Sequence, residues 1–183
     1  MKKRILICLI WVLGISAAGA QMKSASLQAS GLTCALCAKS IYTNLSSLPF
    51  VESVDTDLNA SSFELIFKSN MDVDPSALRK KVEDAGFSVS KLVLRFEANK
   101  QQIENSGFLT IGKFTYHFVQ IKRATYDGLI NINIIDKEYL TAKDYKKKIA
   151  GVKEACYQTP QQEDCKLPNG KESSTHVFHA TIL

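Results

Sequence analysis

The sequence lacks the residue arrangements on which most enzymes depend. It contains no Ser-His-Asp arrangement, no glycine-rich phosphate loop and no pair of carboxylates in a catalytic frame. Asp72 and Asp74 stand directly before a predicted helix, and the start of that helix explains them better than acid–base chemistry. We therefore expect a protein that is not an enzyme.

The chain also has little net charge, and most of what it has lies in its first residues. The 183 residues carry a formal net charge of +5, of which Lys2, Lys3 and Arg4 supply three, with no acid among residues 1–20. Residues 21–183 therefore carry only +2, and their basic run at 146–148 fits a solvated helix face. Because no basic stripe alternates with aromatic residues, we expect no binding of nucleic acid.

Long apolar runs are missing, apart from residues 5–15. This run follows the basic start of the chain and is shorter than the roughly 20 residues that a spanning helix needs. Ala18-Gly19-Ala20 then supplies the small residues that a signal peptidase recognises. The pattern predicts a signal peptide at residues 1–20 rather than a retained anchor. The mature chain would have no membrane span and would be periplasmic or secreted.

Residues 26–96 show a regular succession of strand and helix patterns. Strands are predicted at 27–32, 51–58, 62–68 and 88–96, and helices at 35–47 and from Pro75 to Gly86. Asp74-Pro75 is a good helix start and Gly86 a good helix stop. The order βαββαβ in about 70 residues predicts a ferredoxin-like sandwich, in which two helices cover one face of an antiparallel sheet.

The rest of the chain predicts a second, β-rich unit of the same α+β class. Polar residues at 97–106 favour a linker, and 107–183 favours a C-terminal domain whose fold the pattern does not specify. The predicted elements are strands at 108–111, 114–121, 129–135 and 175–182, a helix at 141–153, and turns at 112–113 and 126–128.

Two cysteines stand where the first predicted strand leads into the first helix. Cys34 lies in the loop and Cys37 in the first helical turn, so their sulfur atoms can converge on one point. The helix N-terminus offers unpaired N–H groups and partial positive charge, which stabilise thiolates. Two thiolates suit linear copper(I), whereas zinc prefers four ligands. Leu32, Leu36 and Phe87 are candidates for shielding this site.

These residues resemble the heavy-metal-associated domain of copper chaperones and of the tails of copper-transporting P-type ATPases. The family motif Gly-Met-Thr-Cys-x-x-Cys matches at Gly31, Thr33, Cys34 and Cys37, with Leu32 in place of Met, and residues 82–87 fit the family's second helix. The resemblance covers residues 26–96. It implies that Cys34 and Cys37 bind the metal and that Phe87 lies near it.

The predicted function is therefore binding of a soft metal for delivery, buffering or sensing. Copper(I) is favoured over zinc or another soft divalent ion, and the expected partner is a metal-transfer protein or a transporter. Two alternatives stay open: a metal-independent interaction module, and a thiol–disulfide oxidoreductase. The oxidoreductase is less favoured because thioredoxin-like sites commonly have Trp before the first cysteine, where this chain has Thr33.

The remaining cysteines and the histidines give weaker signals. Cys156 and Cys165 enclose a short polar loop, which in an exported protein favours a structural disulfide over a second metal site. His176 and His179 lie three apart on a predicted strand and should point to opposite faces, so they should not chelate one ion. His117 is expected to be a satisfied residue within a sheet.

Overall fold

A computed structural model describes residues 20–103, 106–119, 121, 125–151, 157 and 176–183. The predictions for a signal peptide, which concern residues 1–19 above all, and for a Cys156–Cys165 disulfide lie outside these ranges. In the described part of the chain, no helix has the length and apolar character needed to cross a membrane.

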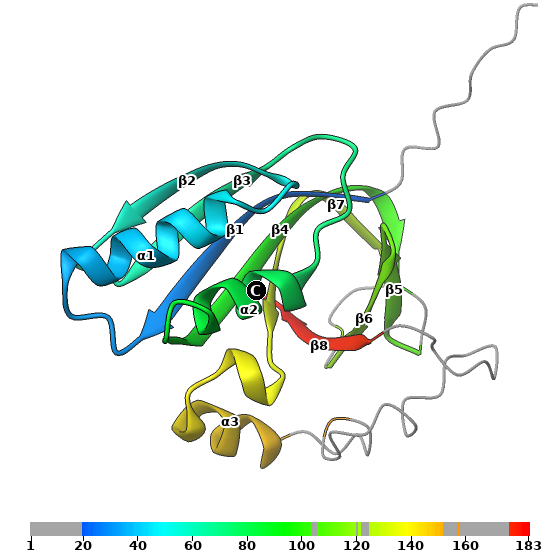
Figure 1. Ribbon diagram of the computed structural model, residues 1–183. Coiled ribbons are helices and arrows are strands. Elements are labelled where there is room, and N and C mark those ends of the chain that lie inside the picture. The colour runs from blue at the N-terminus through cyan, green and yellow to red at the C-terminus, as the bar shows by residue number, and fades with distance from the viewer. Residues whose placement is uncertain (1–19, 104–105, 120, 122–124, 152–156, 158–175) are drawn as a thin grey trace, which may run out of the picture.

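The N-terminal half has the predicted ferredoxin-like architecture. Its elements are β1 (Gln21–Ser30), α1 (Ala35–Ser46), β2 (Val51–Asp57), β3 (Ser62–Phe67), α2 (Pro75–Glu83) and β4 (Ser88–Gln102). The four strands pair antiparallel in the order β2-β3-β1-β4. Helices α1 and α2 lie side by side on one face of this sheet (Figure 1).

Local sequence accounts for the ends of α2. Asp74 is its N-cap, and its Oδ1 accepts a hydrogen bond from the Ser76 N–H at 2.8 Å, while Pro75 occupies the first helical turn. Gly86, just beyond the helix, has φ +87°, a left-handed conformation that strongly favours glycine. Leu78 and Val82 are fully buried on the inner face of the helix, as their spacing predicts.

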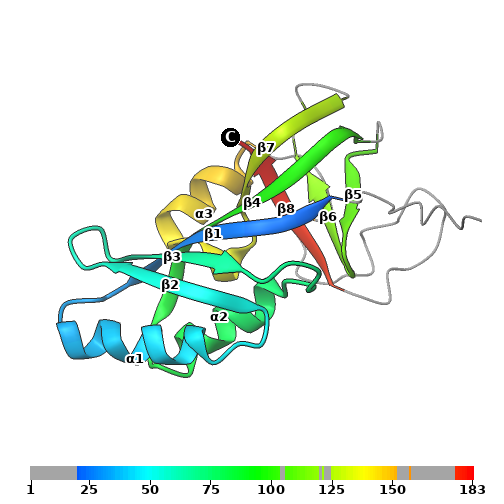
Figure 2. The same ribbon diagram turned by 90° about the horizontal axis from the view of Figure 1, so that it is seen from above.

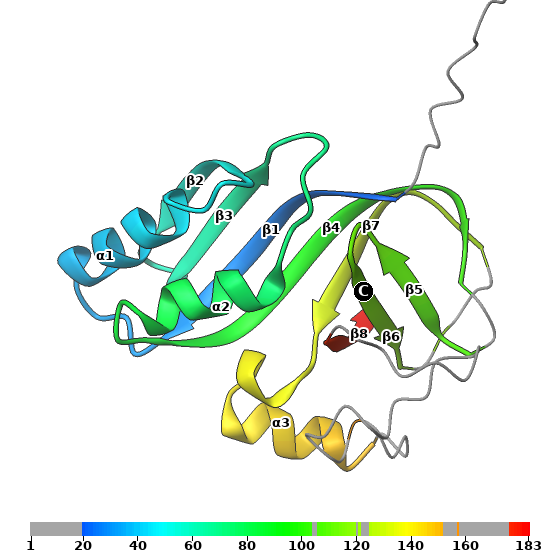
Figure 3. The same ribbon diagram turned by 45° about the vertical axis from the view of Figure 1, so that its right-hand side comes forward.

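The C-terminal half extends the same sheet. Its elements are β5 (Phe108–Ile111), β6 (Phe114–Phe118), β7 (Thr125–Ile134), the short 3-10 helix η1 (Lys137–Tyr139), α3 (Ala142–Ile149) and β8 (Val177–Ile182). The described strands form one eight-stranded sheet in the order β2-β3-β1-β4-β7-β8-β6-β5. This half is β-rich with one α-helix among its described residues, as predicted, and the sheet bends as it passes from β4 to the β5–β6 hairpin (Figure 3).

The structure corrects two predictions where the halves meet. Residues 97–102, predicted as the start of a linker, belong to β4 and pair with β7 from Glu97↔Leu129 to Gln102↔Thr125. Residues 126–128, predicted as a turn, lie inside β7. Gly128 within this segment has φ +78°. On the facing strand β4, the pairing register shifts between Ala98 and Gln101. The turn-like sequence therefore forms an irregularity in the pairing of β4 with β7 instead of a turn.

The two halves share one hydrophobic core. Tyr116 of β6, Phe178 of β8 and Tyr139 of η1 belong to the same buried cluster as Leu78 of α2. An ion pair between Asp72 and Lys113, 3.1 Å long, also joins the loop before α2 to the β5–β6 turn.

Helix α3 lies on the opposite side of the sheet from α1 and α2 (Figure 2). Its Tyr145 and Ile149 pack against Val119 and Ile135, which form a separate small cluster with Tyr157. The second half therefore contributes strands to the shared core on one face and a helix of its own to the other face.

Candidate metal centre

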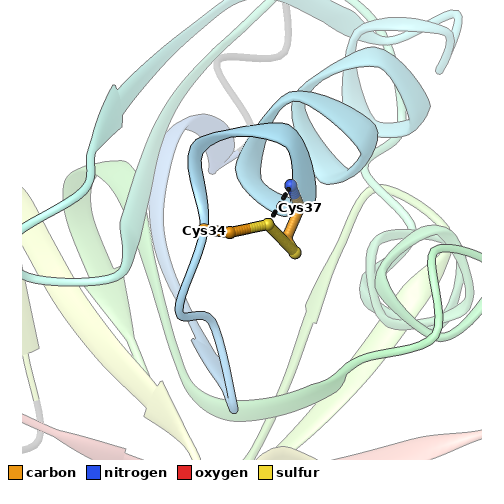
Figure 4. Close-up of a disulfide and its surroundings, with 2 residues drawn as sticks. All are labelled: Cys34 and Cys37. Atoms are coloured by element: carbon orange, nitrogen blue, oxygen red, sulfur yellow. Dashed lines mark hydrogen bonds between the residues drawn. A yellow bond between two sulfur atoms is a disulfide. The ribbon is translucent and has the colours of Figure 1, made fainter.

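The cysteine loop connects β1 to α1 and brings its two sulfur atoms together. Gly31, with φ +78°, turns the chain out of β1. Cys34 follows in an extended conformation as the N-cap residue of α1, and Cys37 lies in the first helical turn. Because one side chain precedes the helix and the other is three residues further on, both reach the same point at the helix N-terminus (Figure 4).

Cys34 and Cys37 form a disulfide, and their Cα atoms are 5.2 Å apart. The Cys37 N–H donates a hydrogen bond to Cys34 Sγ at 3.1 Å, so a sulfur takes the place that a hydroxyl or carboxylate oxygen usually takes at an N-cap. No acidic residue stands in the first turn of α1 to compete for these N–H groups. Reduction of the disulfide would leave two thiols at one point beside the positive end of the helix.

The surroundings of the pair are asymmetric. Cys34 is exposed and Cys37 is partly buried. Leu32 and Phe87 are partly buried and pack against the core. Leu36 does not shield it, because its side chain is 80% exposed.

The near-helical spacing of Leu36, Ile41 and Leu45 in the sequence predicts that all three face the core, and for Leu36 this is wrong. Ala38, Ile41 and Leu45 form the buried stripe of α1, and Leu36 lies outside that stripe.

His117 lies within a strand, as predicted, and the structure adds a neighbour that the sequence did not indicate. His176 lies just before β8 and is exposed, whereas His179 lies within β8 and is 5% exposed. His117 is indeed buried within a strand, yet it also lies directly beside His179, because β6 and β8 pair in parallel with these two residues in register. No local signal could have revealed this neighbour, since the pairing joins segments about 60 residues apart in the chain.

The described residues also limit the number of protein ligands. Within the described ranges, no group of three or more His, Cys, Asp or Glu side chains is placed to hold a metal. A metal ion at the cysteine loop would therefore take two ligands from this part of the protein.

Residues 26–88 match the sequence profile of the heavy-metal-associated domain. A search of the curated proteins gives no match.

Several solved structures are similar to part of the chain. A copper-binding domain of HMA7, a P-type ATPase, is 26% identical, covers 38% of this chain and 92% of its own length, and has a TM-score of 0.35. The yeast copper transporter domain CCC2A is 25% identical, with coverage of 37% and 90% and a TM-score of 0.33. Oxidized MerP from Ralstonia metallidurans CH34 is 23% identical, with coverage of 38% and 94% and a TM-score of 0.35.

Proposed function

Because residues 26–88 form a heavy-metal-associated domain, we propose that this chain is an exported carrier of copper(I), which it holds between Cys34 and Cys37. The observation that carries this proposal is the meeting of both sulfur atoms at the N-terminus of α1. Thiolates are soft ligands, and this position offers them partial positive charge without a competing acid.

The number of ligands favours copper(I) over zinc. A structural zinc site usually has four protein ligands, and the described residues supply two at this loop. Copper(I) accepts two thiolates in a near-linear arrangement. Another soft ion with a low coordination number is the second choice.

The oxidised pair must be reduced before it can bind metal. Reduction takes two electrons and two protons from a thiol reductant, breaks the sulfur–sulfur bond and leaves two thiols. Both thiols then lose their protons when copper(I) binds. In an exported protein this step matters, because the compartment favours disulfides.

Transfer would proceed by exchange of ligands. A thiolate of the partner protein approaches from the exposed side, where Cys34 lies, and adds to the bound ion as a third ligand. One of the two cysteines then releases the ion, and the second follows. Copper keeps its oxidation state, so the protein needs no catalytic residue. The partner would be a second metal-transfer protein or a transporter.

An anaerobic copper(I) titration of the reduced protein against a competing chelator tests this function. We expect one tightly bound equivalent, which is lost in the Cys34→Ser, Cys37→Ser double variant. Leu36→Ala is the matched control, because it changes the exposed residue between the cysteines and keeps both thiols. Equal copper(I) affinity in the double variant and the unmodified protein would contradict the proposal.

The disulfide itself favours thiol–disulfide oxidoreductase as a second candidate. Its exposed Cys34 is accessible to a reacting thiol. This function predicts that the reduced protein accelerates the reduction of insulin disulfides and that Cys34→Ser abolishes the effect. A reduced protein that binds copper(I) tightly and leaves insulin unchanged would exclude this candidate.

A further inference from the structure

Helix α3 concentrates positive charge on the surface of the C-terminal half. Its eight residues include four lysines and one acid, Asp144, which gives this helix a formal charge of +3. All four lysines are exposed. Residues 21–183 as a whole carry only +2, so the exported chain outside α3 is slightly acidic.

Three of these lysines share the outward face of the helix. Lys147 lies four residues after Lys143, and Lys146 lies three residues after it, so the three side chains are neighbours on the helix surface. Tyr145 and Ile149 lie on the other side and pack onto the small apolar cluster beneath α3. We call Lys143, Lys146 and Lys147 the lysine face of α3.

The charge of the lysine face is not compensated within the described part of the molecule. No ion pair there involves a lysine of α3. The acid of this helix, Asp144, is held by its own helix cap, where Thr141 Oγ1 donates to its Oδ2 at 2.6 Å. In α2, by contrast, Arg79 pairs with Glu83 at 2.6 Å and Lys80 with Asp84 at 3.6 Å.

The stability of the helix explains only part of this pattern. Lys146 and Lys147 lie in the last turn, where the helix dipole favours a positive charge. Lys143 is the second residue of α3 and lies beside the positive end of the dipole, where a cation is unfavourable. A residue that opposes a local preference without a structural gain points to a function.

The residue type favours lipid phosphate over a protein partner. The helix contains lysine and no arginine. Protein–protein interfaces are enriched in arginine and depleted in lysine, because the planar guanidinium matches a carboxylate in two places whereas the ammonium acts as a point charge. Clusters of basic residues on an amphipathic helix are typical of contact with anionic lipids. A face built from lysine alone therefore fits a layer of phosphate charges.

We propose that the lysine face of α3 binds the anionic phospholipid headgroups of a membrane surface and holds the exported chain there without inserting it. The apolar side of α3 already packs on the protein, so the attraction is electrostatic. Contact through α3 leaves α1, with the cysteine loop at its start, on the opposite side of the sheet (Figure 2). Only the use of this contact, which is to place a copper(I) carrier beside a membrane transporter, rests on the proposed function.

Sedimentation of the full exported chain with lipid vesicles tests the proposal. One set of vesicles contains phosphatidylcholine alone, and the other contains equal parts of phosphatidylcholine and phosphatidylglycerol. We expect binding to the anionic vesicles only. Binding should be lost between about 0.1 M and 1 M salt, because the screening length falls from about 10 Å to about 3 Å.

A triple variant removes the lysine face. Each lysine near an anionic surface strengthens binding about fivefold, so Lys143→Gln, Lys146→Gln and Lys147→Gln together should weaken it about 100-fold. Glutamine keeps the helix propensity of lysine, and the thermal transition of the variant shows that it is folded.

The matched control removes the same charge from the helices on the opposite side of the sheet. Lys39→Gln, Lys80→Gln and Lys81→Gln together should weaken binding less than about fivefold. Equal losses in the two triple variants would show an effect of net charge alone and overturn the proposal.

Two further outcomes would also overturn it: no sedimentation with anionic vesicles at low salt, or equal sedimentation with both kinds of vesicle. The Cys34→Ser, Cys37→Ser double variant should bind the anionic vesicles as the unmodified chain does. The lysine-face variant should keep its copper(I) affinity. Failure of lipid binding is therefore distinguishable from failure of the metal site.

Discussion

The two halves of this molecule cover their shared sheet in different ways. In the N-terminal half, α1 and α2 cover the inner face of β1–β4. The C-terminal half places no described α-helix of its own on that face; Tyr116 of β6, Phe178 of β8 and Tyr139 of the short 3-10 helix η1 join the cluster that contains α2. The part of the chain that matches the heavy-metal-associated profile therefore shares its core with the C-terminal half, and α2 contacts both halves.

Two residue pairs, Cys34–Cys37 and His117–His179, differ in the same sense. Cys34 and Cys37 come from one local segment and lie at an exposed loop. His117 and His179 come from distant segments and are buried between aromatic rings. The first pair is accessible to a partner, whereas the second is enclosed by the packing of the sheet. Three predictions examine how far the halves depend on each other.

The largest effect is expected from Phe178→Ala. Phe178 is fully buried, and its ring packs against Tyr116 and Tyr139. Loss of a buried phenylalanine costs about 3–5 kcal/mol of the free energy of unfolding. Since the core is shared, chemical denaturation followed by circular dichroism should show one transition, shifted as a whole. Phe114→Ala, at a partly buried ring beside Phe178, should cost less. Two separate transitions would show that the halves are independent.

A smaller effect is expected at alkaline pH. Burial raises the pKa of Tyr116 and of Tyr139 far above the ordinary value of 10.0. Above pH 10 the unfolded chain loses these two protons while the folded protein keeps them, so stability falls as pH rises. Each tyrosine should cost about 1.4 kcal/mol per pH unit.

Denaturation curves at pH 9, 10 and 11 measure this slope, and Tyr116→Phe provides the control. The Tyr116 hydroxyl is buried with no hydrogen bond in the described part of the chain, so its removal should cost little stability at pH 8. It should also remove about a third of the alkaline slope, because burial raises the pKa of Tyr157 as well as those of Tyr116 and Tyr139. An unchanged slope in this variant would show that other groups cause the loss.

The smallest effect is expected from helix caps. Asp74→Ala removes the N-cap of α2 and should lower the free energy of unfolding by about 1 kcal/mol. Thr141→Ala removes the corresponding cap of α3, where Thr141 Oγ1 accepts from the Asp144 N–H at 3.1 Å. Because α3 has no fully buried residue and α2 serves both halves, we expect the second change to affect global stability less. Equal losses of unfolding free energy in the two variants would show that α2 contributes no more to global stability than α3.

Local chemistry explains which parts of the fold could be predicted from the sequence. Asp74-Pro75 and Gly86 delimit α2 through capping and left-handed backbone geometry, which depend on neighbouring residues alone. The alternation of buried and exposed residues identified β3 to within one residue. The convergence of Cys34 and Cys37 also follows from their three-residue spacing at a helix start.

Pairing between distant segments explains what could not be predicted. The polar stretch at 97–102 resembles a linker by composition, and it is a strand only because β7 lies beside it. The place of β8 between β7 and β6 has no local signal. The contact between His117 and His179 depends on that placement, so the sequence alone could not indicate it.

The position of β8 has a consequence for how the protein is made. Among the described strands it is the last to be synthesised, yet it lies inside the sheet, where it separates β7 from the β5–β6 hairpin. Until residues 177–182 leave the ribosome, β6 has no strand pairing with β7 or with the strands beyond it. Completion of the described sheet therefore waits for this late segment. Proteolytic removal of residues 177–182 would separate the β5–β6 hairpin from β7 in the sheet.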